Sequence, residues 1–452
     1  MPHSEPFRRF DYVSPADLQR DLDRMGLELP LLEDPAILAR PCSIGTGTAP
    51  NRVAIQPMEG CDGSADGQPD ALTLRRYQRF ASGGAGLLWV EATAVVPEGR
   101  ANPRQLWLHE QNVEAFRDLV RLIDREAGTK PYKVLQLTHS GRYAKPDGQA
   151  RPLVAAANPW LGKPGQSEVI LPDEALADLV PAYVRAAELA YAAGFQAVDI
   201  KACHRYLLNE LLSARTRPGP YGGSLENRSR LLLDIVRAVK SEVPIDVAVR
   251  LNAYDEIPAP YGWGVREDDH RQPDFSEPAW LVRALQDAGV ALINITGGNP
   301  YYNPHVNRPY DTGPYQPPVH QLYHLTKLLQ ACRTLKQALP PDAPVRFMAS
   351  GLTWLRHLAG PAAAGLVASD WSDLAGFGRQ AFAYPSLATD LLTQGGLDAR
   401  KCCLSCGKCS EIMRDGGQAG CVIHDSAVYL PIYRTGRAGK PPLSKKDVAE
   451  HV

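Results

Sequence analysis

The sequence predicts an α/β protein: a TIM (β/α)8 barrel with a short C-terminal iron–sulfur-binding extension. Three observations lead to this prediction. Short apolar or β-branched runs alternate with amphipathic stretches, as in repeated βα units. Eight such runs can be counted, and eight is the number of strands that closes a barrel. Five of the nine cysteines lie close together near the C-terminus, between Cys402 and Cys421.

The composition is that of a soluble globular enzyme. Of 452 residues, 44% are hydrophobic and 22% are charged, and the length suits one barrel with an appendage. Lys plus Arg number 49 and Asp plus Glu 50, so the net charge of -1 offers no basic field for nucleic acid. The sequence shows neither an apolar run of about 18 residues nor an N-terminal leader. We therefore expect a cytoplasmic protein with no membrane partner.

The predicted elements divide the chain into three parts: an N-terminal arm (1–40), the barrel (41–395) and a cysteine-rich tail (396–452). The predicted strands, in chain order, are 53–58, 86–95, 133–139, 197–202, 246–252, 291–296, 345–350 and 373–378. Predicted helices lie between them, for example at 174–193 and 227–243. The alternation predicts a parallel sheet whose strands all end at one face.

A long segment rich in Pro, Tyr and Asn, residues 298–318, follows the sixth predicted strand. It leaves the carboxyl end of that strand, where barrel enzymes build their active sites. Long loops in such places are more often functional than accidental, and we expect a lid over a small-molecule substrate. The alternative is a Pro-rich contact in a homo-oligomer.

Lys201, His204 and Tyr206 follow the fourth predicted strand. A cation, an imidazole and a phenol that converge at the barrel mouth can stabilise a developing oxyanion and deliver a proton. Taken alone, this pattern is modest, because a His or Tyr at a strand end more often has a structural role.

The tail carries the sharpest motif, Cys403-x2-Cys406-x2-Cys409-x11-Cys421. Three closely spaced thiolates and a distant fourth can surround a [4Fe–4S] cluster, with one sulfur on each iron. Four cysteines with similar spacing also suit a tetrahedral zinc ion, so the motif alone leaves both readings open. Cys402 is a further thiol that competes with Cys403 as the first ligand.

A set of ordered motifs across residues 32–392 resembles the Old Yellow Enzyme family of FMN-dependent barrels, also described as NADH:flavin oxidoreductases. In chain order the motifs are Asn51-Arg52, Gln56-Pro57-Met58, Gly83-Gly84-Ala85-Gly86, Val90-Glu91-Ala92-Thr93, Gln136-Leu137-Thr138-His139-Ser140-Gly141-Arg142, His204-Arg205-Tyr206-Leu207, Tyr221-Gly222-Gly223-Ser224-Leu225-Glu226-Asn227-Arg228, Arg250 and Gly378-Arg379. Each motif is weak by itself, but their order and spacing together are specific.

The resemblance implies a bound FMN and a position for each of its parts. The ring system would contact Pro57, Met58 and Ala92, its pyrimidine edge Gln136 and Arg250, and the phosphate Gly351, Gly378 and Arg379. Physical chemistry supports the phosphate group independently. Glycines after the seventh and eighth strands let backbone N–H groups approach a phosphate, and arginine adds a planar pair of donors.

The resemblance also implies roles for the residues after the fourth strand. Tyr206 matches the proton donor of the family, and His204 matches one member of the pair that binds a substrate carbonyl. Lys201 stands where the other member is normally a ring donor such as His. Lysine brings a compact charge whose pKa falls when it is buried, and it suits a carbonyl or carboxylate ligand.

The tail resembles the iron–sulfur branch of the same family, which includes 2,4-dienoyl-CoA reductase and trimethylamine dehydrogenase. The resemblance implies a [4Fe–4S] cluster on Cys403, Cys406, Cys409 and Cys421, with Cys403 favoured over Cys402. Those relatives continue into reductase-like domains, whereas no G-x-G-x-x-G turn follows the cysteines here. We expect a separate electron-transfer partner, which would be a reductase subunit, a ferredoxin or a flavoprotein. Direct reduction by NAD(P)H is the alternative.

These expectations combine into an FMN- and iron–sulfur-dependent oxidoreductase that reduces an activated C=C bond. Hydride would pass from FMN to the alkene, with Tyr206 as proton donor. One alternative reverses the electron flow: an amine or C–H substrate is oxidised and the electrons leave through the cluster. A noncatalytic electron-transfer subunit is the other alternative, and the His204 and Tyr206 pair argues against it.

Overall fold

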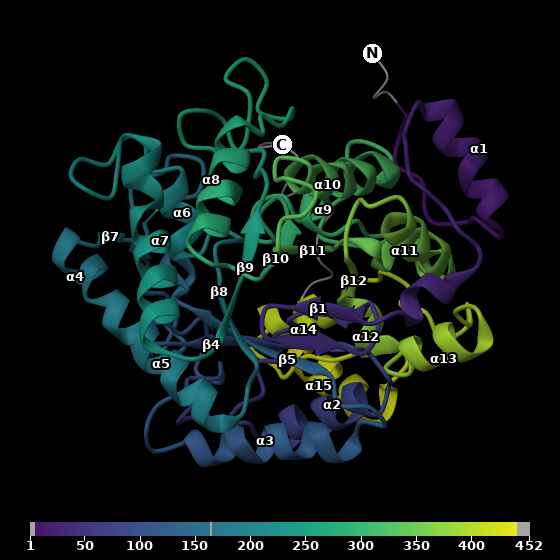
Figure 1. The fold of residues 1–452 in the computed structure, drawn as a ribbon, viewed down its shortest axis with the longest axis horizontal. Helices are drawn as coiled ribbons and strands as arrows, with labels where there is room; N and C mark the ends of the chain where they lie inside the picture. Colours follow the sequence, from purple (N-terminus) through teal and green to yellow (C-terminus); the bar gives the residue numbers. More distant parts are fainter. Residues whose placement is uncertain (1–4, 163–164, 441–452) are drawn as a thin grey trace.

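Eight parallel strands close into a barrel in the computed structural model of the protein, which describes residues 5–162 and 165–440 (Figure 1). The predicted TIM barrel is confirmed, and each predicted run supplies one strand. In chain order, which is also their order around the barrel, the strands are β3 (Val53–Ile55), β4 (Leu87–Ala94), β5 (Tyr132–Thr138), β8 (Ala197–Ile200), β9 (Asp246–Asn252), β10 (Leu292–Thr296), β11 (Arg346–Ala349) and β12 (Leu374–Phe377).

Most observed strands are shorter than predicted at their carboxyl ends. The first, β3, stops at Ile55, although the pattern predicts a strand as far as Met58. Pro57 has no amide hydrogen to donate to a neighbouring strand, and it also restricts the residue before it. The backbone therefore leaves the barrel wall here, and the residues after β3 line the mouth.

Helices surround the barrel (Figure 1). The α-helices between and after the strands are α2 (Ala71–Ala81), α3 (Val113–Glu126), α4 (Asp173–Ala177), α5 (Leu179–Ala193), α6 (Leu207–Leu212), α7 (Leu225–Glu242), α8 (Ser276–Asp287), α9 (Pro304–Asn307), α10 (Gln321–Lys336), α11 (Ala359–Ala368), α12 (Arg379–Ala383) and α13 (Leu387–Gln394). Short 3-10 helices occur at η1 (Pro35–Ala39), η2 (Pro97–Gly99), η3 (Gly141–Tyr143) and η4 (Leu352–Leu358), and β6 (Leu153–Val154) pairs with β7 (Val169–Ile170).

The helix predicted at 174–193 is divided into α4 and α5 at Asp178. Pro181 lies in the first turn of α5, where its missing amide costs nothing. In one continuous helix the same ring would clash with the carbonyl of Ala177, four residues earlier. The sequence pattern therefore identified the helical segment but not the break in it.

A small hairpin, β1 (Cys42–Ile44) and β2 (Gly47–Ala49), closes the amino end of the barrel. Its buried side chains pack with the first residues of the barrel strands, including Trp89 and Tyr132. Asp246 ties the hairpin to the barrel by accepting hydrogen bonds from the Tyr132 hydroxyl at 2.8 Å and the Thr46 amide at 2.9 Å. Because this end is filled, the opposite, carboxyl end is left for chemistry.

The N-terminal arm contains one α-helix, α1 (Pro15–Met25). Ser14 and Asp17 form a reciprocal cap at its start, which satisfies otherwise unpaired amides. Before the helix, Phe10 packs edge-on against Trp354, and its amide donates to Asp311 at 3.1 Å. Asp311 belongs to the 298–318 segment, so the arm helps to hold that segment.

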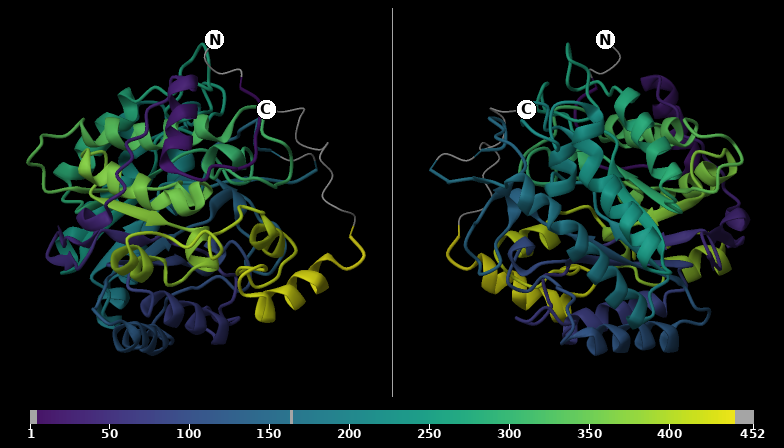
Figure 2. Two further views of the ribbon diagram at one scale, coloured as in Figure 1. Left: turned by 90° about the vertical axis from the view of Figure 1, so that its right-hand side faces the viewer. Right: turned by 60° about the vertical axis from the view of Figure 1, so that its left-hand side comes forward.

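The tail returns to the barrel and packs beside α2 (Figure 2). It contains α14 (Lys408–Arg414) and α15 (Ser426–Arg437). Asp425 accepts hydrogen bonds from Arg75 at 2.7 and 2.9 Å and also pairs with Arg79. The Ala419 amide donates to the Gly60 carbonyl at 2.7 Å. These contacts hold the tail against the barrel wall near the strand ends.

None of the helices in the described part of the chain is both long enough and apolar enough to cross a membrane.

Candidate active site

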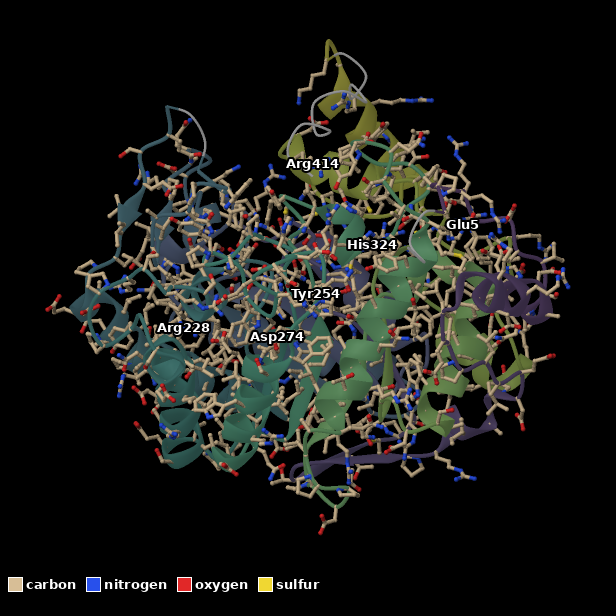
Figure 3. All side chains as sticks on the ribbon, turned by 90° about the horizontal axis from the view of Figure 1, so that it is seen from above. Glu5, Arg228, Tyr254, Asp274, His324 and Arg414 are labelled. Carbon is tan, nitrogen blue, oxygen red and sulfur yellow. The ribbon has the colours of Figure 1, made fainter. Side chains whose placement is uncertain are left out.

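A cavity with about 1190 Å³ of empty space opens at the carboxyl ends of the barrel strands. It brings together all the residues predicted to contact FMN or substrate: Pro57, Met58, Ala92, Gln136, Lys201, His204, Tyr206, Arg250, Gly351, Gly378 and Arg379. The tail also reaches this cavity, through Ser410, Met413 and Arg414 of α14. Figure 3 shows Arg414 where the yellow tail meets the rest of the molecule.

Asp199 organises the polar groups on the cavity floor. Its carboxylate accepts a hydrogen bond from Gln136 Nε2 at 2.6 Å and another from the Arg250 amide at 2.7 Å. Because a carboxylate only accepts, this contact orients the amide of Gln136 and leaves its oxygen to accept from a ligand. Burial raises the pKa of Asp199 to about 6, while the bonds from Gln136 and Arg250 favour its charged form.

Two glycines lie at the strand ends, where a side chain would disturb the cavity or the backbone. A Cβ added at Gly378 would lie 3.0 Å from Met58 Sδ, so the methionine side chain would have to shift. Gly351, after β11, has φ +97°, in the region that favours glycine. Both residues present bare backbone to the cavity.

Three arginines, Arg308, Arg379 and Arg414, line the cavity next to these glycines. Burial and the charges of Arg379 and Arg414 lower the pKa of Arg308 to about 10, while Cys409 opposes them. Arg379 donates to the Pro309 carbonyl at 2.9 Å. Three guanidinium groups that line one cavity are suited to an anion such as a phosphate.

Tyr206 and Lys201 form the closest contact among the predicted catalytic residues. Lys201 Nζ lies 3.5 Å from the centre of the Tyr206 ring, well inside the range of a cation–π interaction. Both side chains are buried. Burial lowers the pKa of Lys201 and raises that of Tyr206 well above its usual value. The pair therefore places a cation against a protonated phenol.

His204 adopts a left-handed backbone conformation, with φ +63°, that turns its side chain into the cavity. Its amide donates to Asn252 Oδ1 at 3.1 Å, and its Nε2 lies 3.1 Å from Asn307 Nδ2. Burial lowers the pKa of His204 well below 6.5, and Arg250 and Lys201 lower it further. The imidazole is therefore neutral at physiological pH.

The sequence pattern did not assign several side chains that line or flank the cavity. Glu59 directly follows the Pro57-Met58 pair and accepts from Asn102 Nδ2 at 2.9 Å. Burial raises the pKa of Glu59, and the charge of Lys201 opposes that increase. Its position after a known motif was the only signal that could have identified it.

Tyr301, from the 298–318 segment, also lines the cavity, and its hydroxyl lies 3.1 Å from that of Tyr206. Its ring stacks on Tyr143, with centroids 3.8 Å apart and an interplanar angle of 24°. Its pairing with Tyr206 joins residues 95 positions apart, and no local pattern predicts such a contact.

The four predicted cluster cysteines, Cys403, Cys406, Cys409 and Cys421, line a second, smaller cavity with about 350 Å³ of empty space. Cys402 does not line it, and its thiol faces the Asp398 carbonyl at 3.4 Å. Across residues 5–162 and 165–440, no three or more His, Cys, Asp or Glu side chains are grouped closely enough to hold one metal ion. Arg379 lines both this cavity and the larger one.

Comparison with known proteins agrees with this geometry. The profile of the NADH:flavin oxidoreductase / NADH oxidase family matches residues 38–263. NADPH dehydrogenase of Bacillus pumilus (strain SAFR-032) is 32% identical over 267 residues, which cover 58% of this chain and 73% of that protein.

Two solved structures show the same fold. A 2-naphthoyl-CoA reductase in complex with 2-naphthoyl-CoA superposes with a TM-score of 0.69 at 20% identity, over 89% of this chain and 58% of that one. Histamine dehydrogenase from Rhizobium sp. 4-9 superposes with a TM-score of 0.66 at 19% identity, over 86% of this chain and 52% of that one. This chain thus spans little more than half the length of either.

The barrel, the cavity at its carboxyl end and the matched sequence profile lead to one assignment. The chain belongs to the NADH:flavin oxidoreductase / NADH oxidase family and is an FMN-dependent NAD(P)H oxidoreductase of the old yellow enzyme type.

Proposed function

We propose that this protein reduces an activated C=C bond, with Tyr206 as the proton donor, and that its tail carries a [4Fe–4S] cluster. The observation that carries the proposal is the position of Tyr206. Its phenol is 2% exposed, lies against the ammonium of Lys201, and faces the cavity that holds the residues expected to bind FMN. A phenol of this kind can protonate a carbon that water reaches poorly.

The residues of the cavity suit FMN. Arg250 Nε is buried and has no hydrogen-bond partner among the residues that the structure describes, so it is available to a ligand. The amide of Gln136 is oriented by Asp199, and the three arginines beside Gly351 are suited to the phosphate. When bound there, FMN would supply a hydride to the substrate.

The chain's own residues would divide the remaining work. His204, neutral and held by Asn307, can donate a hydrogen bond to an activating carbonyl. Lys201 lies on the Tyr206 ring, where its charge stabilises the phenolate that remains after proton transfer. Lys201, which stands in place of a ring donor, would therefore stabilise the deprotonated form of Tyr206 as well as bind the substrate.

The tail supports a cluster through its cavity and its amides. A cubane takes one thiolate on each iron and so needs space between the cysteines, whereas one zinc ion draws four sulfurs to a single centre. The four cysteines line one cavity and do not converge on a single centre, which favours the cubane over one zinc ion. The amides of Ser405 and His424 donate to the thiols of Cys403 and Cys421 at 3.4 and 3.3 Å. A cluster held there would supply electrons one at a time.

A second function, oxidation of an amine or C–H substrate with electrons leaving through the cluster, is favoured by two observations. Arg379 borders both cavities, so the two cofactor positions would be neighbours. The stacked rings of Tyr143 and Tyr301 could bind a cationic substrate. The similarity of fold to histamine dehydrogenase adds a precedent.

One preparation tests these functions. Protein purified without oxygen should release about one FMN and about four irons and four sulfides per chain. Flavin reduced by NADPH should then be reoxidised by 2-cyclohexenone in the absence of oxygen, and Tyr206→Phe should slow this step by about 100-fold or more. The Tyr206→Phe variant should still accept electrons from NADPH.

Other results would redirect or overturn the proposal. Bleaching of the oxidised flavin by histamine, without reoxidation by the enone, would assign the second function. Zinc without sulfide would remove the cluster. If Tyr206→Phe reduced the enone as fast as the parent enzyme, Tyr206 would not be the proton donor.

A further inference from the structure

We infer that Tyr301 is a proton relay, which returns a proton from solvent to Tyr206 after each reduction. The inference rests on the proposed function, because it assumes that Tyr206 protonates the substrate. It also assigns a chemical role to the 298–318 segment beyond that of a cover.

Tyr206 needs such a relay because it is enclosed. Only 2% of its surface is exposed, whereas 52% of Tyr301 is exposed, and the two hydroxyl oxygens lie 3.1 Å apart. This separation is slightly longer than the usual range for a hydrogen bond between hydroxyl groups, and either oxygen can be the donor. The buried acid thus contacts a side chain that lines the cavity and is half exposed.

The position of Tyr301 is held from two sides. Its ring stacks on Tyr143, and its amide donates to Asn299 Oδ1 at 3.0 Å. The side chain of Asn299 in turn donates to the Tyr143 hydroxyl at 2.8 Å. A ring fixed in this way keeps its hydroxyl in place during turnover, which proton transfer over a short path requires.

The protons and electrons balance as follows. NAD(P)H supplies one hydride equivalent, which is a proton with two electrons, and this hydride reaches the β-carbon of the alkene. The α-carbon takes the phenol proton of Tyr206. The resulting phenolate accepts the hydroxyl proton of Tyr301, and Tyr301 regains a proton from water. One alkene, one NAD(P)H and one proton thus give one saturated product and NAD(P)+.

Other ionisable groups near Tyr206 have different roles. Lys201 lies on its ring and stabilises the phenolate, but the structure gives its ammonium little access to solvent. Glu59 and Cys61 also act electrostatically on Tyr206, and no hydrogen bond joins either to its hydroxyl in the described structure. Tyr301 is the group that both touches the Tyr206 hydroxyl and is exposed.

The test compares one turnover with many, in the complete FMN-loaded enzyme. Tyr301→Phe keeps the stacked ring and removes only the hydroxyl. The first reduction uses the proton already on Tyr206, so reoxidation of prereduced enzyme by 2-cyclohexenone should stay within about 2-fold of the parent rate. Steady-state turnover with NADPH should fall by about 10-fold or more, and added imidazole buffer should partly restore it. Tyr302→Phe, one residue along, is the matched control.

The outcomes distinguish a proton relay from a purely structural role of Tyr301. Equal loss in both regimes, without rescue by imidazole, would make Tyr301 a positioning residue and overturn the relay. Unchanged turnover would also overturn it. Tyr206→Phe separates the relay from the proposed function: if that variant reduces the enone normally, the assignment of Tyr206 is wrong. If it fails while Tyr301→Phe turns over normally, only the relay is wrong.

Discussion

Replacing Arg308 by Met should have opposite effects on the flavin-free and the flavin-bound protein. Burial and the charges of Arg379 and Arg414 lower the pKa of Arg308 from the usual arginine value to about 10. The folded pKa lies below the unfolded one, so the cost of keeping the charge is fully present below pH 10. This cost disappears only as the pH rises from about 10 through the usual pKa of arginine.

The charge of Arg308 sets the size of both effects, on the stability of the flavin-free protein and on the affinity for FMN. The lowered pKa corresponds to at most about 3 kcal/mol, less where solvent screens the charge. Arg308→Met should therefore raise the unfolding temperature of the flavin-free protein by several degrees. A hydrogen bond to a charged group contributes about 1.5–3 kcal/mol, so the affinity for FMN should fall by roughly 10- to 150-fold.

The assay uses protein from which the flavin has been removed. Thermal unfolding gives the stability, and titration with FMN, followed by the loss of flavin fluorescence, gives the dissociation constant. Arg266→Met is the control, since Arg266 is an exposed arginine paired with Asp268 at 2.8 Å and should change neither quantity appreciably. The reasoning is refuted if Arg308→Met destabilises the flavin-free protein or binds FMN as tightly as the parent.

Three further predictions concern the cluster cysteines, Lys201 in the cavity and the attachment of the tail. Cys403→Ser should lose most of the iron and sulfide, while Cys402→Ser should keep both; the reverse result would make Cys402 the ligand. Burial lowers the pKa of Lys201, so the rate of enone reduction should fall with rising pH at pH values below the usual pKa of lysine. Lys201→Arg should shift this fall to higher pH, because arginine keeps its charge. An unchanged pH profile of the variant in stopped-flow measurements would contradict this. Asp425→Asn should speed proteolysis of the tail several-fold by weakening its pairing with Arg75, and cleavage at the parent rate would show that the pairing is dispensable.

The strands of the barrel could be predicted because each is recognised from residues that are neighbours in the sequence. Each strand is a short apolar run between polar segments, and the alternation of such runs with helices admits few architectures. The predicted boundaries were wrong where a proline interrupts the apolar pattern. Pro57 ended the first strand early, and Pro181 divided a helix whose apolar pattern continues through it.

Only those residues of the candidate site that belong to the ordered motifs could be predicted from the sequence. The motifs identified Tyr206 and Arg379 as residues of the cavity, because both follow the ends of barrel strands. They did not identify Arg308 or the pairing of Tyr301 with Tyr206. Both belong to the 298–318 segment, whose path over the mouth depends on contacts with distant parts of the chain.

The sequence by itself determined the fold class and the flavin-dependent family, because hydrophobic periodicity and motif order can be recognised along the chain. Only the tertiary structure decided which groups touch. The lysine at position 201 lies on the ring of Tyr206, and the tail reaches the same cavity as the strand ends. The physical reason is that charges and hydrogen bonds act over a few ångströms in space. Folding brings such groups together from positions that no local pattern connects.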